Sequence, residues 1–216
     1  MINTKFILIL FHLPLFAIAL YALVIWKKLK PELKVLAWYL VLTGVLQIVS
    51  LVLWFLHVNN LPILHFLVPL RFVLLVFMYK SILSGYVRSW VLDALMIGFC
   101  AFSVLNTLFF DPWDTFNSNA MTVESILLII LSLSTYVFFM DKRMTEHLKN
   151  YLRSVELMNS GVFIYYTSSL LLTYFGKYII QVINPELSRY TWIIHGIFSV
   201  IMYCYFWRAL WKQNTT

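Results

Sequence analysis

LPILHFLVPLRFVLLVFMYK, residues 61–80, is the stretch that decides the fold. A helix of about 20 residues is long enough to cross a hydrocarbon core of ~30 Å. The stretch also carries Arg71 near its middle, where a charged side chain is costly unless it faces a protein interior or a wet cavity. Other helices must therefore surround this segment and supply a partner for Arg71.

The composition of the whole chain indicates a membrane protein. Of its 216 residues, 62% are hydrophobic and 12% are charged, and the mean hydropathy is +0.85. These values lie far outside the range of soluble domains. No polar stretch approaches the length of a soluble domain, so we expect residues 1–216 to form a single membrane domain.

Windows of about 20 residues identify seven apolar segments, which predict an all-α, polytopic bundle of seven transmembrane helices. The segments are residues 6–26, 35–57, 61–80, 89–110, 119–140, 158–180 and 191–211. Within residues 144–157, the apolar side chains of Leu148, Leu152 and Val155 recur at helical spacing. This pattern predicts an amphipathic helix that lies on the cytoplasmic surface or extends the sixth segment.

The basic residues predict the orientation. Twelve of the 16 Lys and Arg residues lie at one end of the segments, whereas only Lys5 and Arg189 lie at the other. Because positively charged loops remain in the cytoplasm, we expect the N-terminus outside and the C-terminus in the cytoplasm of a multi-pass protein of the inner (plasma) membrane. The net charge of +7 then reflects topology, so the predicted partner is the lipid bilayer and not nucleic acid.

Polar residues inside the segments fall almost entirely in the outer half of the bilayer. Their desolvation cost predicts an outward-facing polar pocket between the third, fifth, sixth and seventh segments, with no cofactor. Hydrogen bonds between helices would produce the same stripes, so that interpretation stays open. The candidate ligand-binding residues are His65, Arg71, Glu124, Tyr166, Thr173, Lys177 and His195.

Glu124 is the preferred partner of Arg71. The arginine lies about five residues deeper than the glutamate, or ~7–8 Å along the bilayer normal, which an extended arginine spans. We therefore predict a structural ion pair between Arg71 and Glu124. In the alternatives, Arg71 faces a water-filled cavity or holds an anionic ligand through its guanidinium fork.

The outward pocket favours a sensor or receptor-like module that binds a small or lipidic ligand. No kinase, cyclase or other output domain is recognisable, so signalling would require a separate cytoplasmic partner. The first alternative is a small-solute transporter, because Pro69 beside Arg71 lies near the midplane and the segments allow a three-one-three repeat.

The second alternative is an intramembrane, metal-dependent lipid hydrolase, in which His65, Glu124 and His195 would hold zinc and activate water. Seven-helix ceramidase-like enzymes carry paired histidines one turn apart on a late helix. Here Ser199 stands four residues after His195, which breaks that motif. An enzyme is therefore the less favoured class, and no catalytic residue is assigned.

Three further stretches belong together: FNSNAMTVES at residues 116–125, Asn159-Ser160-Gly161 followed by Ile164-Tyr165-Tyr166, and Trp192-Ile193-Ile194-His195. They resemble a group of small, largely uncharacterised seven-helix bacterial inner-membrane proteins without a proven activity. The resemblance implies a layout similar to the membrane input modules of bacterial signalling systems. The group is expected to carry His-Tyr-Thr and a glutamate on its third helix, where this chain has His65-Phe66-Leu67-Val68 and Arg71.

Overall fold

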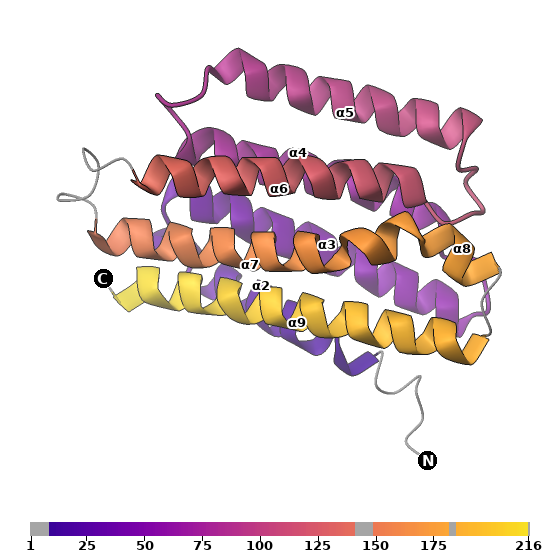
Figure 1. The fold of residues 1–216 in the computed structure, drawn as a ribbon. Coiled ribbons are helices and arrows are strands. Elements are labelled where there is room, and N and C mark those ends of the chain that lie inside the picture. The colour runs from indigo at the N-terminus through magenta and orange to yellow at the C-terminus, as the bar shows by residue number, and fades with distance from the viewer. Residues whose placement is uncertain (1–8, 141–148, 182–184, 216) are drawn as a thin grey trace.

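A computed structural model describes residues 9–140, 149–181 and 185–215, and this part of the chain is helical. The fold class predicted from the sequence, all-α, is confirmed (Figure 1). The elements in chain order are α2 (Leu13–Val24), the 3₁₀ turn η1 (Trp26–Lys28), α3 (Pro31–Phe55), α4 (Pro62–Ile82), α5 (Ser89–Phe109), α6 (Ser118–Met140), α7 (Lys149–Tyr174), α8 (Gly176–Gln181) and α9 (Pro185–Thr215).

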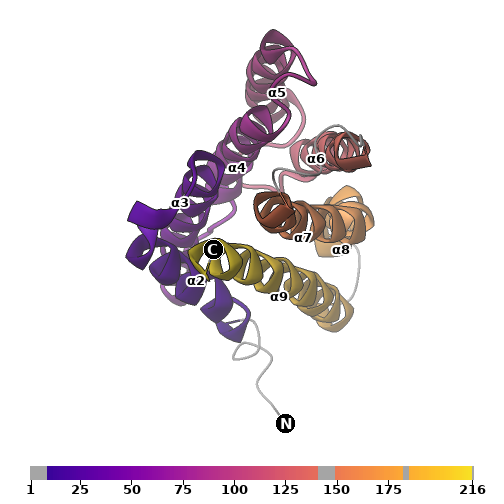
Figure 2. The ribbon, with the colours of Figure 1, turned by 90° about the vertical axis from the view of Figure 1, so that its left-hand side faces the viewer.

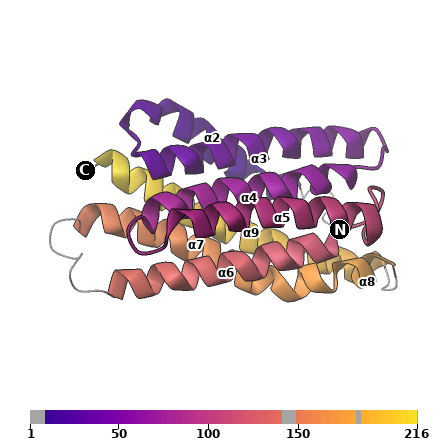
Figure 3. The same ribbon diagram turned by 90° about the horizontal axis from the view of Figure 1, so that it is seen from above.

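The long helices form two layers. Seen along their axes, α3, α4 and α5 make one row, and α6, α7 and α9 make the other (Figure 2). The layers meet where α4 packs against α6, and α2 closes the bundle between α3 and α9. α5 lies at the edge of the bundle in Figure 2 and packs mainly against α4, beside which it runs in the view from above (Figure 3).

The two ends of the bundle differ in charge. We call the end that holds residues 25–30 and 83–88 and the C-terminus the basic end, because most Lys and Arg residues lie there. The other end, which holds residues 56–61 and 110–117, is called the far end.

In the described part of the chain, five helices are long and apolar enough to cross a membrane. They are α3, α4, α5, α6 and the part of α9 from Tyr190 to Gln213. The described part of the first predicted segment contains α2, a shorter apolar helix of 12 residues. α7 has 26 residues but is less apolar, because charged residues lie near its start and amide and hydroxyl side chains follow along it. The chain thus has the architecture of a helical membrane protein.

Prolines mark several helix starts. Pro14, Pro31 and Pro62 occupy the first turn of α2, α3 and α4, where the missing N–H has no helical partner to lose. The chain turns at Phe11–His12 just before α2. By contrast, Pro69 lies inside α4, and the helix continues through it.

The sixth predicted segment, residues 158–180, is not one helix, because α7 ends at Tyr174 and α8 begins at Gly176. The side chain of Ser118 lies at the break. Its hydroxyl lies 2.5 Å from the carbonyl oxygen of Thr173 and 3.0 Å from that of Tyr174, so it supplies a donor to carbonyls at the end of α7.

At its other end, the sixth segment extends further than 158. Of the predicted amphipathic stretch 144–157, residues 144–148 lie outside the described residues, and the rest belongs to α7. Val155 is buried there, while Arg153 and Glu156 are exposed. These residues therefore continue the helix of the sixth segment.

α7 and α9 approach each other closely at Gly161. A Cβ atom at this position would lie 2.9 Å from the Cβ of Tyr205 and 3.2 Å from the carbonyl oxygen of Met202. Small residues allow such backbone approach between membrane helices. Gly161 is therefore the residue that lets these two helices pack as one unit.

Candidate ligand-binding site

A cavity of about 540 Å³ lies in the far half of the bundle. Its lining comes mainly from α3, α4, α9 and the residues at the start of α2, while α7 contributes Tyr165. We call this cavity the pocket. Its volume falls in the range of about 300–1,000 Å³ typical of small-molecule sites.

α3 contributes a polar stripe to the pocket. Thr43, Gln47 and Ser50 follow one another at the helical spacings i, i+4 and i+7, so they share one face. The amide nitrogen of Gln47 donates to Nε2 of His12 at 3.0 Å, which ties the turn before α2 to α3. The amide nitrogen of Asn60 donates to the hydroxyl oxygen of Ser50 at 2.8 Å.

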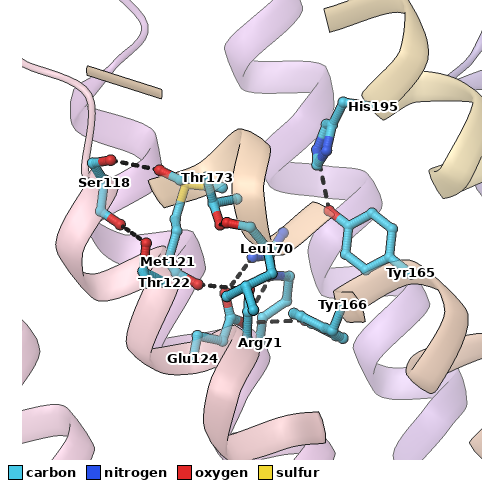
Figure 4. A network of polar contacts seen from close by, with 11 residues as sticks. Arg71, Ser118, Met121, Thr122, Glu124, Tyr165, Tyr166, Leu170, Thr173 and His195 are labelled. Atoms are coloured by element: carbon cyan, nitrogen blue, oxygen red, sulfur yellow. Dashed lines mark hydrogen bonds and ion pairs between the residues drawn. The ribbon is translucent and has the colours of Figure 1, made fainter. Parts of the chain in front are cut away.

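α9 provides the opposite stripe, formed by His195, Ser199 and Tyr203 at four-residue spacing. The Tyr165 hydroxyl is hydrogen-bonded to Nε2 of His195 at 3.3 Å (Figure 4). Gly196 lies between these polar positions, and a Cβ atom there would overlap the ring of Phe11. The absence of a side chain at Gly196 therefore lets the turn before α2 lie against α9.

An ion pair closes the inner end of the pocket. Nε of Arg71 donates to Oε1 of Glu124 at 3.1 Å, and Nη2 donates to Oε2 at 2.5 Å (Figure 4). The Tyr166 hydroxyl adds a third hydrogen bond, to Oε1 at 3.2 Å. The Arg71 side chain is 10% exposed and the Glu124 side chain 0%. Arg71 thus faces the pocket, and Glu124 lies behind it.

This pair is electrostatically balanced. Charges in a dry interior attract strongly, and each is costly without the other. The carboxylate of Glu124 has three donors around it, and two nitrogens of Arg71 are satisfied by one carboxylate. Beyond the pair, towards the basic end, fully buried apolar side chains fill the core, among them those of Phe72, Leu75 and Phe206. The pocket therefore ends at Arg71.

A second buried polar network lies nearer the basic end and joins α4, α6 and α7. The Tyr79 hydroxyl donates to Oδ1 of Asn159 at 2.9 Å, and the Asn159 amide donates to the carbonyl of Ser132 at 3.2 Å. The Ser132 hydroxyl donates in return to the carbonyl of Asn159 at 3.4 Å. None of these residues lines the pocket. This network connects helices to one another.

Of the predicted ligand-binding residues, the structure places Arg71 and His195 in the lining of the pocket. Glu124 and Tyr166 lie behind Arg71, so they support the site without lining it. The Thr173 hydroxyl donates to the carbonyl of Leu170 in its own helix. The side chain of Lys177 lies outside the described part of the structure.

The prediction that His65 contributes to the pocket differs from the structure. Its Nε2 lies 3.2 Å from the carbonyl of Thr115, which can only accept, so Nε2 donates. Nδ1 lies 2.8 Å from the Thr107 hydroxyl, which also donates to the carbonyl of Ser103 at 3.0 Å. Both ring nitrogens are thus used to join α4 to α5 and to the following loop.

The walls of the pocket also differ from those expected. The sequence indicates which face of each helix is polar, but not which helix that face meets. The stripes on the fifth and sixth segments serve the contact between α6 and α7, as Ser132 and Asn159 illustrate. Thr43, Gln47 and Ser50 line the pocket but are not among the predicted site residues. They form a polar stripe at helical spacing in an otherwise apolar segment, and this stripe could have identified them.

The three candidate metal ligands His65, Glu124 and His195 do not form one group. Among the described residues, no three His, Cys, Asp or Glu side chains are close enough together to hold a metal ion. Instead, each candidate is engaged separately, His65 with threonines, Glu124 with Arg71 and His195 with Tyr165.

Comparisons with protein-family models, curated proteins and solved structures found no match for this chain. The resemblance to bacterial seven-helix proteins, and the origin it implies, therefore finds no support in them. The geometry of the pocket has to carry the functional argument.

Proposed function

We propose that this protein is a receptor-like membrane module that binds a small or lipidic ligand in the pocket. In this proposal α2 and α7 join the five apolar helices to give seven crossings, with the basic end in the cytoplasm and the pocket opening to the outside. The charge bias supports this orientation, because twelve of the 16 Lys and Arg residues flank the same ends of the predicted segments in the sequence.

One observation carries the binding proposal: a cavity of about 540 Å³ that ends on a buried, balanced ion pair. Intramembrane charged residues are expensive and usually mark functional sites. Mixed aromatic and polar lining is typical of ligand pockets. A bound ligand would influence a cytoplasmic partner through α7, which provides Tyr165 to the pocket and reaches the basic end.

Binding is favoured over transport by two observations. A transporter of this size would use broken helices at the midplane, yet α4 continues through Pro69 next to Arg71. A solute would also have to pass the packed apolar core beyond the ion pair.

Labelling of single cysteines tests the orientation and the access of water. In a background with Cys100→Ala and Cys204→Ala, Gln47→Cys places a thiol in the pocket, and Ile48→Cys places one at the same depth on the exposed, apolar face of α3. A small membrane-impermeant thiol reagent added to intact cells should modify the first and not the second. Modification of Gln47→Cys only in inverted vesicles would contradict the orientation.

Ligand recovery tests the binding itself. Ser199→Trp fills the pocket, while Thr167→Trp adds the same side chain at an exposed position of α7. Mass spectrometry of the purified proteins should detect a small molecule retained by the wild type and by Thr167→Trp and lost from Ser199→Trp. Equal retention by all three proteins would contradict binding in the pocket.

A further inference from the structure

The lining of the pocket is almost free of permanent charge. Among the described residues that line it, Arg71 is the one side chain with a permanent charge. The other polar groups are neutral hydroxyls and amides and two histidines, His12 and His195. The charge that a ligand meets is therefore decided by the state of Arg71.

Arg71 is already neutralised. Its Nε and Nη2 both donate to Glu124, whose side chain is fully buried. An anionic ligand beside Arg71 would give the site a net negative charge in a medium of low dielectric, and a cationic ligand would meet no unpaired carboxylate. Either charge would lose its hydration without gaining a counter-ion, which is strongly unfavourable.

The polar groups near Arg71 suit a neutral headgroup. The hydroxyls of Tyr165, Ser199 and Tyr203 offer donors and acceptors of hydrogen bonds. Towards the far end, the lining becomes aromatic with Trp54, and with Phe116 and Trp192, whose ring centroids lie 5.2 Å apart. The pocket thus has a polar inner end and aromatic rings nearer the far end, where Ser50 and Asn60 also line it.

We propose that the ligand is an uncharged amphiphile with a hydroxyl or carbonyl head, and that the Arg71–Glu124 pair excludes charged relatives of the same shape. This inference rests on the proposed binding function and specifies its ligand class. The headgroup would lie beside Arg71 and Tyr165, with its apolar body against the aromatic rings.

Three probes of equal chain length, 1-decanol, decanoate and decylammonium, distinguish the possibilities. The Gln47→Cys protein, in the cysteine-free background and in lipid nanodiscs, is reacted with uncharged N-ethylmaleimide at equal membrane concentrations of each probe. Decanol should slow the reaction at least about tenfold more than either charged probe. Ser199→Trp, which fills the pocket, should abolish this protection.

Glu124→Gln inverts the expected selectivity. Removing the carboxylate leaves the positive charge of Arg71 without its partner, so decanoate should now protect the thiol better than decanol. The double variant Arg71→Gln/Glu124→Gln carries no buried charge and should again prefer decanol. The double variant also keeps the test informative where Glu124→Gln alone folds poorly.

The outcomes separate this inference from the proposed function. Protection of the wild-type pocket by decanoate equal to that by decanol would overturn the ligand class, while the pocket would remain a binding site. Protection by none of the three probes would also overturn it. Failure of the binding proposal itself has a different signature, which is retention of the native small molecule by Ser199→Trp.

Discussion

The two buried polar networks of this bundle are built from similar parts but have different surroundings. The network near the basic end joins Tyr79, Asn159 and Ser132, and none of these residues lines the pocket. The network in the far half joins Arg71, Glu124 and Tyr166, and one of its members faces the pocket. Burial of polar groups therefore does not by itself identify a functional site.

The difference lies in charge. The first network contains only neutral groups, whose hydrogen bonds suffice to join helices in lipid. The second contains two full charges, which a membrane protein rarely buries for packing alone. Variants in the two networks should therefore differ both in their effect on stability and in their effect on the ligand.

The largest effect is expected for Glu124→Ala, which leaves Arg71 without its counter-ion. Removal of one partner of a buried pair costs about 3–5 kcal/mol. Thermal unfolding in detergent should show a much larger loss than for Thr135→Ala, a control that removes a buried hydroxyl bonded to the carbonyl of Leu131 in the same helix. An equal loss in the two variants would contradict the importance of the pair.

A smaller effect is expected for Asn159→Ala. This change removes the acceptor of the Tyr79 hydroxyl and the donor to the Ser132 carbonyl, which should cost about 1–3 kcal/mol. Unfolding in detergent measures the loss of stability. Protection of Gln47→Cys by decanol should stay unchanged, because Asn159 does not line the pocket, and a loss of protection would remove the distinction between the two networks.

The smallest effect is expected for Tyr166→Phe, which removes a single long hydrogen bond to Glu124 and keeps the ring. The cost should be about 0.5–1.5 kcal/mol. Tyr136→Phe is the matched control, since its hydroxyl donates to Ser160 at 2.9 Å away from the pocket. Both variants should lose similar stability, but only Tyr166→Phe should weaken the preference for decanol over decanoate. An equal preference in both would show that Tyr166 does not help to hold the charge balance.

Much of this arrangement can be predicted from residue types and spacing. The apolar segments correspond to helices, and the depths of Arg71 and Glu124 already favour their pairing. The partners of His65 could not be predicted in this way, because the two threonines that it contacts lie far away in the sequence, on α5 and in the following loop. The contact of Ser118 with the carbonyl of Tyr174 likewise joins two helices that are far apart in the sequence.

The walls of the pocket could not be predicted from the sequence either, because they too depend on contacts between residues far apart in the chain. The stripe with His195, Ser199 and Tyr203 is visible in the sequence, but the pairing of that stripe with α3 requires the packing order of the helices. Periodicity gives the direction of a side chain relative to its own helix only. Which helix a polar face contacts is known only once the helices are packed.

The contact at Gly161 has a consequence for how the pocket can respond to a ligand. Tyr165 lies one helical turn after Gly161 and is hydrogen-bonded to His195 on α9, so the wall that α7 and α9 form here rests on a close backbone approach. On the opposite side, α3 is joined to the turn before α2 by the Gln47–His12 hydrogen bond, and we expect expansion on ligand entry to occur there. We therefore expect the wall formed by α7 and α9 to stay in place when a ligand enters, and the wall formed by α2 and α3 to move.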